Sequence, residues 1–77
     1  RREAPRALDA AHHDLDIADL GRLGYYVDAH TTGRPLVLVH AIHAAASAYD
    51  VRPLFEAFRR ERPVFAPDLP GFGTSDR

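Results

Sequence analysis

The longest unbroken run of strand-forming apolar residues, Leu36–Val39, divides the chain into two parts. Because no polar residue alternates with these four, both faces of the strand are expected to be buried, as in a sheet covered on two sides. Pro35 stands just before the run, where a strand tolerates a missing N–H. The run leads into His40-Ala41-Ile42-His43. Ligands of open α/β sheets bind outside the carboxyl ends of the strands, so the pattern places a crevice here.

The residues before this strand predict an antiparallel hairpin at the edge of a sheet. Residues 15–18 alternate between apolar and polar, as a half-buried strand does. Residues 23–29 contain two Tyr and a Val, which favour strands. Asp19-Leu20-Gly21 between them is typical of a turn. Residues 1–13 are polar and alanine-rich, so we expect a polar arm or a marginal helix there.

The residues after the strand predict a helix and then a second, parallel strand. Asp50 is placed to cap the helix, and Pro53 is tolerated in its first turn. Residues 64–66 are again apolar without alternation. A connection that contains a helix suits the right-handed crossover between parallel strands. The helix would present one apolar stripe, made of Val51, Leu54, Phe55 and Phe58.

The loop after the second strand contains a predictable turn and a carboxylate that needs a distant donor. Pro70-Gly71 fits the central positions of a type II turn, where Gly supplies a positive φ. Asp68 would ordinarily accept the amide two residues on, but Pro70 has no N–H. The Asp68 carboxylate is therefore expected to bind donors at Gly71 or beyond, or on another loop.

Composition excludes several classes of protein. The chain has 77 residues, fewer than a typical domain of about 100–150. The net charge of -1 gives no indication of a nucleic-acid partner. No apolar run approaches the roughly 20 residues of a membrane span, and the N-terminus lacks the apolar core of a signal peptide, so we expect a cytoplasmic protein. Without Cys, and with no spaced partners for His12-His13-Asp14, no metal or cofactor is expected.

The two loops carry a family resemblance. A strand ending in His40-Ala41-Ile42, a helix, and a second strand running into Asp68-Leu69-Pro70-Gly71-Phe72-Gly73-Thr74-Ser75 resemble the N-terminal part of the α/β-hydrolase fold. The resemblance covers roughly residues 15–77 and implies an incomplete N-terminal portion of a single domain, comprising residues 1–77. It implies hydrolysis of carboxylic esters or related acyl compounds, with a small-molecule substrate and no cofactor.

The resemblance also implies site residues. In this family the loop after a His-Gly pair supplies a backbone N–H to the oxyanion hole, and by position this donor is the amide of Ile42, beside Ala41. The nucleophile, the acid and the catalytic histidine are expected beyond Arg77, so none of the present residues is expected to be catalytic. Residues implied to brace the two loops are His40, Asp68, Gly71, Gly73 and Ser75.

Several alternatives stay open at this point. An epoxide hydrolase or haloalkane dehalogenase with an Asp nucleophile is one, although position 43 lacks the Pro of their His-Gly-x-Pro motif, and Ala41 replaces its Gly. A non-catalytic binding or interaction fragment of the same fold is another. A GTPase motif needs a phosphate-loop Lys, and the chain has no Lys. A dinucleotide fingerprint needs a third Gly where Asp76 stands.

Overall fold

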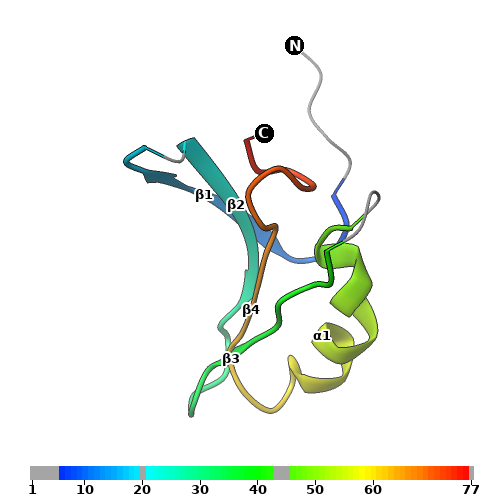
Figure 1. Cartoon of the computed structure of the whole chain (residues 1–77). Coiled ribbons are helices and arrows are strands. Elements are labelled where there is room, and N and C mark those ends of the chain that lie inside the picture. Colours follow the sequence, from blue (N-terminus) through cyan, green and yellow to red (C-terminus); the bar gives the residue numbers. More distant parts are fainter. Residues whose placement is uncertain (1–5, 20, 43–45, 77) are drawn as a thin grey trace.

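A four-stranded mixed sheet with one short α-helix forms the body of the molecule (Figure 1). The computed structural model describes residues 6–19, 21–42 and 46–76. The strands lie in the order β1-β2-β4-β3, so the predicted edge hairpin and the parallel strand–helix–strand unit are both confirmed. The elements are β1 (Ala11–Ile17), β2 (Gly21–Asp28), β3 (Leu36–Val37), the 3-10 helix η1 (Ala48–Val51), α1 (Arg52–Phe58) and β4 (Val64–Pro67).

The hairpin is longer than the sequence predicted. β1 pairs with β2 from Ala11 opposite Val27 to the turn, so residues 11–13 belong to a strand and not to a polar arm. The preceding residues are also packed, because Leu8 is buried and the Ala7 N–H donates to the Tyr26 hydroxyl at 2.8 Å. The predicted arm is therefore wrong for residues 7–13, since contacts with the sheet hold them. Residues 1–5 of that arm lie outside the described residues.

The parallel strands β3 and β4 do not lie where the sequence predicted them, with the Leu36–Val39 strand inside the sheet. β4 lies between β2 and β3, so the Leu36–Val39 segment is at the edge of the described sheet. Leu38 is buried and its N–H donates to the Phe65 carbonyl oxygen at 2.9 Å. Val37 and Val39, however, are 57% and 58% exposed. The prediction of burial on both faces is wrong for the described part of the chain, because α1 covers only one face.

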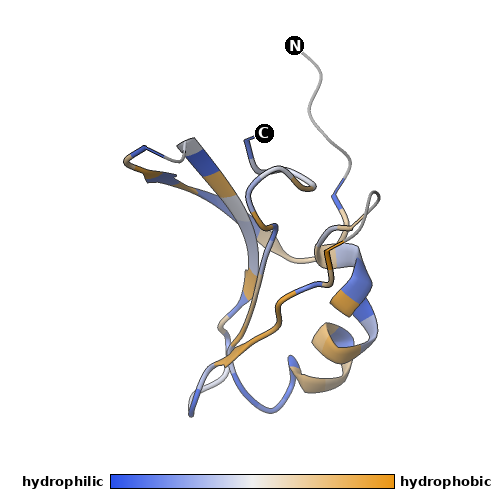
Figure 2. Ribbon diagram, viewed as in Figure 1, coloured by the Kyte–Doolittle hydropathy of each residue, from blue (hydrophilic) through white to orange (hydrophobic). Residues whose placement is uncertain are grey.

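The hydrophobic core lies between α1 and the sheet. Figure 2 shows hydrophobic residues along β3, the chain that follows it and parts of α1. Phe55 is fully buried. Leu54 is 49% exposed, so its predicted place in the apolar stripe is wrong. Burying a side chain such as Phe55 contributes about 1.5–3 kcal/mol. The core comprises Leu8, Tyr26, Leu38, Ala48, Val51, Phe55, Val64 and Ala66.

The start of the helical segment is fixed by a side-chain cap. The segment begins with η1, which precedes α1, so its cap is Ser47 and not the predicted Asp50. The Ser47 hydroxyl oxygen accepts the Tyr49 N–H at 3.1 Å. Pro53 lies in the first turn of α1, as predicted. Among the described residues, no helix combines the length and apolar character needed to cross a membrane.

An arginine after α1 joins the helix to the sheet. The Arg59 Nε donates to the Asp28 carboxylate at 2.8 Å, and another guanidinium nitrogen donates to the Asp9 carbonyl oxygen at 3.0 Å. Although burial by itself raises the pKa of Asp28, hydrogen bonds from His30 and Arg59 lower it below its usual value. Arg59 thus joins the end of α1 to β2 and to the segment that precedes β1.

Candidate functional site

Two loops meet at one edge of the sheet, because β3 and β4 run parallel and both loops follow the ends of these strands. His40 of the first loop is buried, and its Nε2 accepts the Leu69 N–H of the second loop at 3.0 Å. Its Nδ1 lies 2.6 Å from the Ala41 carbonyl oxygen, which only accepts. Both contacts are satisfied by the neutral imidazole with its proton on Nδ1. His40 therefore joins the two loops and has no free nitrogen.

The residue expected from the sequence to be an oxyanion donor, Ile42, lies in the first loop. The Ile42 side chain is 76% exposed, and among the described residues its amide has no hydrogen-bond partner. Ala41 does not have a positive φ, since Asp19 is the only described non-glycine residue that does. Ala41 thus occupies a backbone conformation that an L-residue tolerates. His43, the other histidine of this motif, lies outside the described residues.

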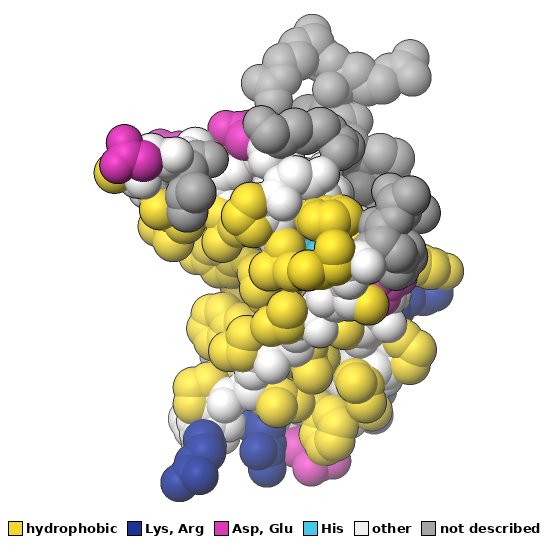
Figure 3. Space-filling model, viewed as in Figure 1, with side chains coloured by type: hydrophobic (Ala, Val, Ile, Leu, Met, Phe, Trp, Pro, Cys, Tyr) yellow, Lys and Arg dark blue, Asp and Glu magenta, His cyan; other side chains and the backbone are white. Residues whose placement is uncertain are grey.

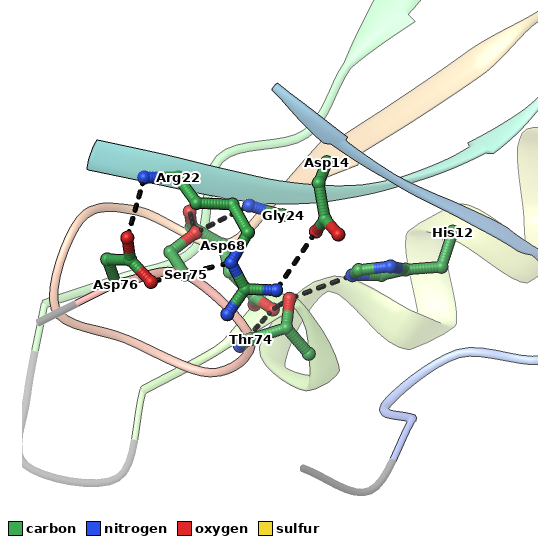
Figure 4. A network of polar contacts seen from close by, with 8 residues as sticks. All are labelled: His12, Asp14, Arg22, Gly24, Asp68, Thr74, Ser75 and Asp76. Atoms are coloured by element: carbon green, nitrogen blue, oxygen red, sulfur yellow. Dashed lines mark hydrogen bonds and ion pairs between the residues drawn. The ribbon is translucent and has the colours of Figure 1, made fainter. Parts of the chain in front are cut away.

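Asp68 is the anchor of the second loop. Its carboxylate is buried and accepts three hydrogen bonds (the residue is labelled in Figure 4). Oδ1 accepts the Ala48 N–H at 2.6 Å, and Oδ2 accepts both the N–H and the hydroxyl of Thr74 at 2.9 and 2.8 Å. The predicted donors beyond Gly71 and on another loop are both present. Asp68 consequently fixes the second loop to the start of η1.

Two glycines shape the second loop. The Phe72 N–H donates to the Leu69 carbonyl oxygen at 2.9 Å, and Gly71 has a φ of 87°, which confirms the predicted turn at Pro70-Gly71. Gly73 is required for space as well, because a Cβ atom there would lie 2.4 Å from the Asp68 carboxylate. The loop can therefore wrap around the carboxylate only with Gly at position 73.

Ser75 and Asp76 attach the end of this loop to β2. The Ser75 hydroxyl accepts the Gly24 N–H at 2.8 Å and donates to the Asp68 carbonyl oxygen at 2.5 Å. The Asp76 carboxylate accepts the Arg22 N–H at 2.8 Å and lies 3.4 Å from the Arg22 Nε (Figure 4). The Ser75 hydroxyl is buried, accepts one hydrogen bond and donates another. It therefore has a structural role and is not free to act as a nucleophile.

His12 and Thr74 belong to the same network, and sequence reasoning missed both. The His12 Nε2 lies 2.8 Å from the Thr74 hydroxyl (Figure 4). Because that hydroxyl donates its proton to Asp68, His12 must be the donor and carries a proton on Nε2. Gly24 permits this approach, since a Cβ atom there would lie 2.1 Å from the Thr74 hydroxyl oxygen. Extending the period-two pattern of β1 back to residue 12 would have placed His12 and Asp14 on one face.

The stability of the fold is expected to fall below neutral pH through His12. Burial, followed by the charge of Arg6, lowers the pKa of His12 from its ordinary value of 6.5. The folded state thus favours the neutral imidazole. The contribution of His12 to the free energy of unfolding is therefore complete above pH 6.5 and declines as the pH falls toward the lower pKa that His12 has in the folded state. Urea unfolding at pH 8, 7, 6 and 5 measures this. His12→Gln, which keeps a side-chain donor, should lose less stability than the wild type between pH 7 and 5. Equal losses of stability would contradict the role of His12 in this pH dependence.

Within the described residues the arrangement is a small α/β unit whose two strand-end loops are held together by hydrogen bonds. Comparisons with protein-family models, with curated proteins and with solved structures found no match for the chain. No group of three or more His, Asp or Glu side chains in the described part is placed to hold a metal ion.

Proposed function

We propose that this chain supplies the oxyanion-hole loop of an α/β-fold hydrolase that acts on carboxylic esters or related acyl compounds. The observation that carries the proposal is the Ile42 amide, which has no partner among the described residues and lies in the loop that follows the parallel strand β3. The loop that bears it is fastened to its neighbour through His40 and Leu69. A backbone donor that has no protein partner, on a loop fastened in this way, is available to a developing oxyanion.

In the proposed reaction a nucleophile attacks the substrate carbonyl, and its π electrons move to the oxygen. The Ile42 N–H donates a hydrogen bond to that oxyanion. Collapse of the tetrahedral intermediate re-forms the carbonyl, breaks the bond to the alcohol oxygen and leaves an acyl-enzyme, and the alcohol takes the proton that the nucleophile gave up. Water then attacks the acyl-enzyme, which releases the carboxylic acid and restores the nucleophile. His40 takes no part in proton transfer, because both of its ring nitrogens are occupied. Its role is to position the loop. A fixed donor of this kind lowers the barrier by about 2.7–4 kcal/mol.

The nucleophile in this proposal comes from outside the 77 residues. The hydroxyls of Thr74 and Ser75 are buried and already bonded to Asp68, so neither is free to attack a substrate. No G-x-S-x-G segment is present in the sequence. We favour Ser over Asp as the nucleophile because position 43 is His and not the Pro of the epoxide hydrolase and dehalogenase motif.

Treatment of the protein in its full natural length with a serine-directed fluorophosphonate is expected to give one covalent adduct, detected by mass spectrometry. The adduct should map to a serine on a strand-to-helix elbow, because only an activated serine displaces fluoride from this reagent. The heat-unfolded protein serves as the control and should give none. No adduct together with turnover of epoxides or haloalkanes would favour an Asp nucleophile. No adduct and no turnover would favour a non-catalytic binding fragment.

A further inference from the structure

A second polar cluster lies at the end of the sheet away from the two loops. Asp28 ends β2 and pairs with Val64 at the start of β4, whereas the two loops follow the other ends of β3 and β4. Figure 3 shows both basic and acidic side chains at this end of the molecule. The cluster borders a surface pocket of about 510 Å³, which we call the far pocket. The far pocket is lined by His30, Glu56, Ala57, Arg59 and Arg60.

The imidazole of His30 is held by the carboxylate of Asp28. One oxygen of this carboxylate accepts the backbone N–H of His30 at 3.3 Å and also contacts the ring Nδ1, while the other accepts the Arg59 Nε–H at 2.8 Å. Burial raises the pKa of Asp28, but the hydrogen bonds from His30 and Arg59 outweigh burial and lower it, so Asp28 is ionised at neutral pH. An ionised carboxylate only accepts hydrogen bonds. Nδ1 therefore carries the proton of the neutral imidazole, and the lone pair is on Nε2.

The second ring nitrogen of His30 is available to a ligand. The His30 side chain is 62% exposed, and Nε2 has no partner within the described part of the chain. The Asp28 carboxylate that holds the ring is only 12% exposed and is itself bonded to Arg59, so the ring has a fixed orientation. The far pocket thus contains one fixed acceptor, which favours a ligand that carries a hydrogen-bond donor.

Two guanidinium groups line the same pocket. Arg60 is exposed, and among the described residues it has no hydrogen bond or ion pair. Arg59 uses three of its five N–H donors, on Asp28, Glu56 and the Asp9 carbonyl oxygen, which leaves two donors free. Guanidinium groups are the usual partners of phosphate oxygens. The far pocket therefore combines several donors for an oxyanion with a single acceptor.

We propose that the far pocket binds hydrogen phosphate, an oxyanion that keeps a hydroxyl at neutral pH. Its charged oxygens accept hydrogen bonds from Arg59 and Arg60, and its hydroxyl donates to Nε2 of His30. Sulfate has a similar shape and charge but no hydroxyl, so a sulfate oxygen would face the Nε2 lone pair with no proton between them. Two carboxylates beside the pocket offset the two guanidinium charges, so the expected dissociation constant is on the order of 1 mM. This site is independent of the proposed hydrolase function.

The protonation of the His30 ring is the first point to test. Long-range proton–nitrogen NMR correlation of the imidazole rings, in the protein of full natural length at pH 8, distinguishes the two ring nitrogens. The His30 signals, assigned by their absence in His30→Gln, should show a proton on Nδ1 and none on Nε2. A proton on Nε2 would overturn the proposal, because the ring would then donate to phosphate and sulfate alike.

Titration with sodium phosphate and with sodium sulfate, at an ionic strength held constant with sodium chloride, measures the preference. The NMR signal of the Ala57 backbone amide reports binding, since Ala57 lines the far pocket. At pH 8 phosphate should bind about two- to tenfold more tightly than sulfate, which corresponds to one hydrogen bond. At pH 5 the imidazole is protonated and phosphate has a single negative charge, so sulfate should bind at least as tightly. Circular dichroism checks that the protein is folded at both pH values.

Two results of the titration would overturn the proposal. One is equal affinity for phosphate and sulfate at pH 8. The other is the absence of saturable phosphate binding below roughly 50 mM, whether the far pocket then stays open or is covered by further sequence of the same protein. Absence of hydrolase activity in a protein that binds phosphate as expected would count against the proposed function alone.

Three variants locate the binding site. Arg60→Gln should weaken phosphate binding at least about threefold, because it removes a cation that has no other partner in the described part. Arg52→Gln is the matched control, since Arg52 is also exposed but begins α1 and does not line the far pocket, and it should change the affinity less than about twofold. His30→Gln should abolish the preference for phosphate at pH 8, because an amide can present either its donor or its acceptor. Equal effects of the two arginine variants, or a preference that persists in His30→Gln, would overturn the proposal.

Discussion

Asp68→Ala is expected to lower the free energy of unfolding by about 2–6 kcal/mol. The substitution leaves the buried amides of Ala48 and Thr74 without an acceptor, and each unsatisfied donor costs about 1–3 kcal/mol. A single small core rarely supplies more than about 3–5 kcal/mol. We therefore expect a large unfolded population at room temperature.

Urea unfolding followed by circular dichroism measures this effect, and two further variants calibrate it. Asp68→Asn keeps one acceptor oxygen but turns an amino group toward one of the two amides, so its loss should be about half that of Asp68→Ala. Asp16→Asn removes a carboxylate from an exposed position of β1 and should change stability by less than about 0.5 kcal/mol. Similar losses for Asp68→Ala and Asp16→Asn would show that the Asp68 hydrogen bonds contribute little.

The second large effect is expected at Ile42, in catalysis. In the protein of full natural length, Ile42→Pro should lower kcat about 10²–10³-fold, because proline removes the N–H that is proposed to bind the oxyanion. Ile42→Ala retains the amide, and the Ile42 side chain is largely exposed, so kcat should change little. Steady-state hydrolysis of a short-chain nitrophenyl ester measures both.

Proline also restricts the residue before it, so a control must separate the lost donor from an altered Ala41. An ester bond in place of the Ala41–Ile42 amide, introduced by semisynthesis, removes the N–H and leaves the side chain unchanged. It should reproduce the loss seen with Ile42→Pro. Normal activity in the ester-bonded protein would show that this amide does not stabilise the oxyanion, even if Ile42→Pro were inactive.

The strand pairing could be anticipated from local pattern, whereas the burial of the strands could not. The alternation in residues 15–18 and the turn at Asp19 predicted the hairpin, and a helix between two apolar runs predicted the parallel pair. Whether Val37 and Val39 are buried depends on what lies across the sheet, which no local pattern specifies. The start of β1 was missed because His12 and His13 have no strand preference of their own and are held by pairing with β2.

The site could be predicted only as far as a single residue's chemistry constrained it. The absence of an N–H at Pro70 implied that Asp68 needs distant donors, and the structure supplies them from Thr74 and Ala48. His12 gave no such signal. It contacts Thr74, which is 62 positions away, and only the three-dimensional fold brings the two together.

That separation has a consequence for the order of folding. The contacts that fasten the second loop join residues far apart in sequence, 62 positions for His12 and Thr74 and 54 for Arg22 and Asp76. Closing such long loops costs entropy before any contact forms, so these contacts are favoured only after the local hairpin has assembled. During synthesis the hairpin leaves the ribosome first and must wait for residues 68–76. The contacts of the second loop thus form after the hairpin, and until then the groups that later surround Asp68 remain in contact with water.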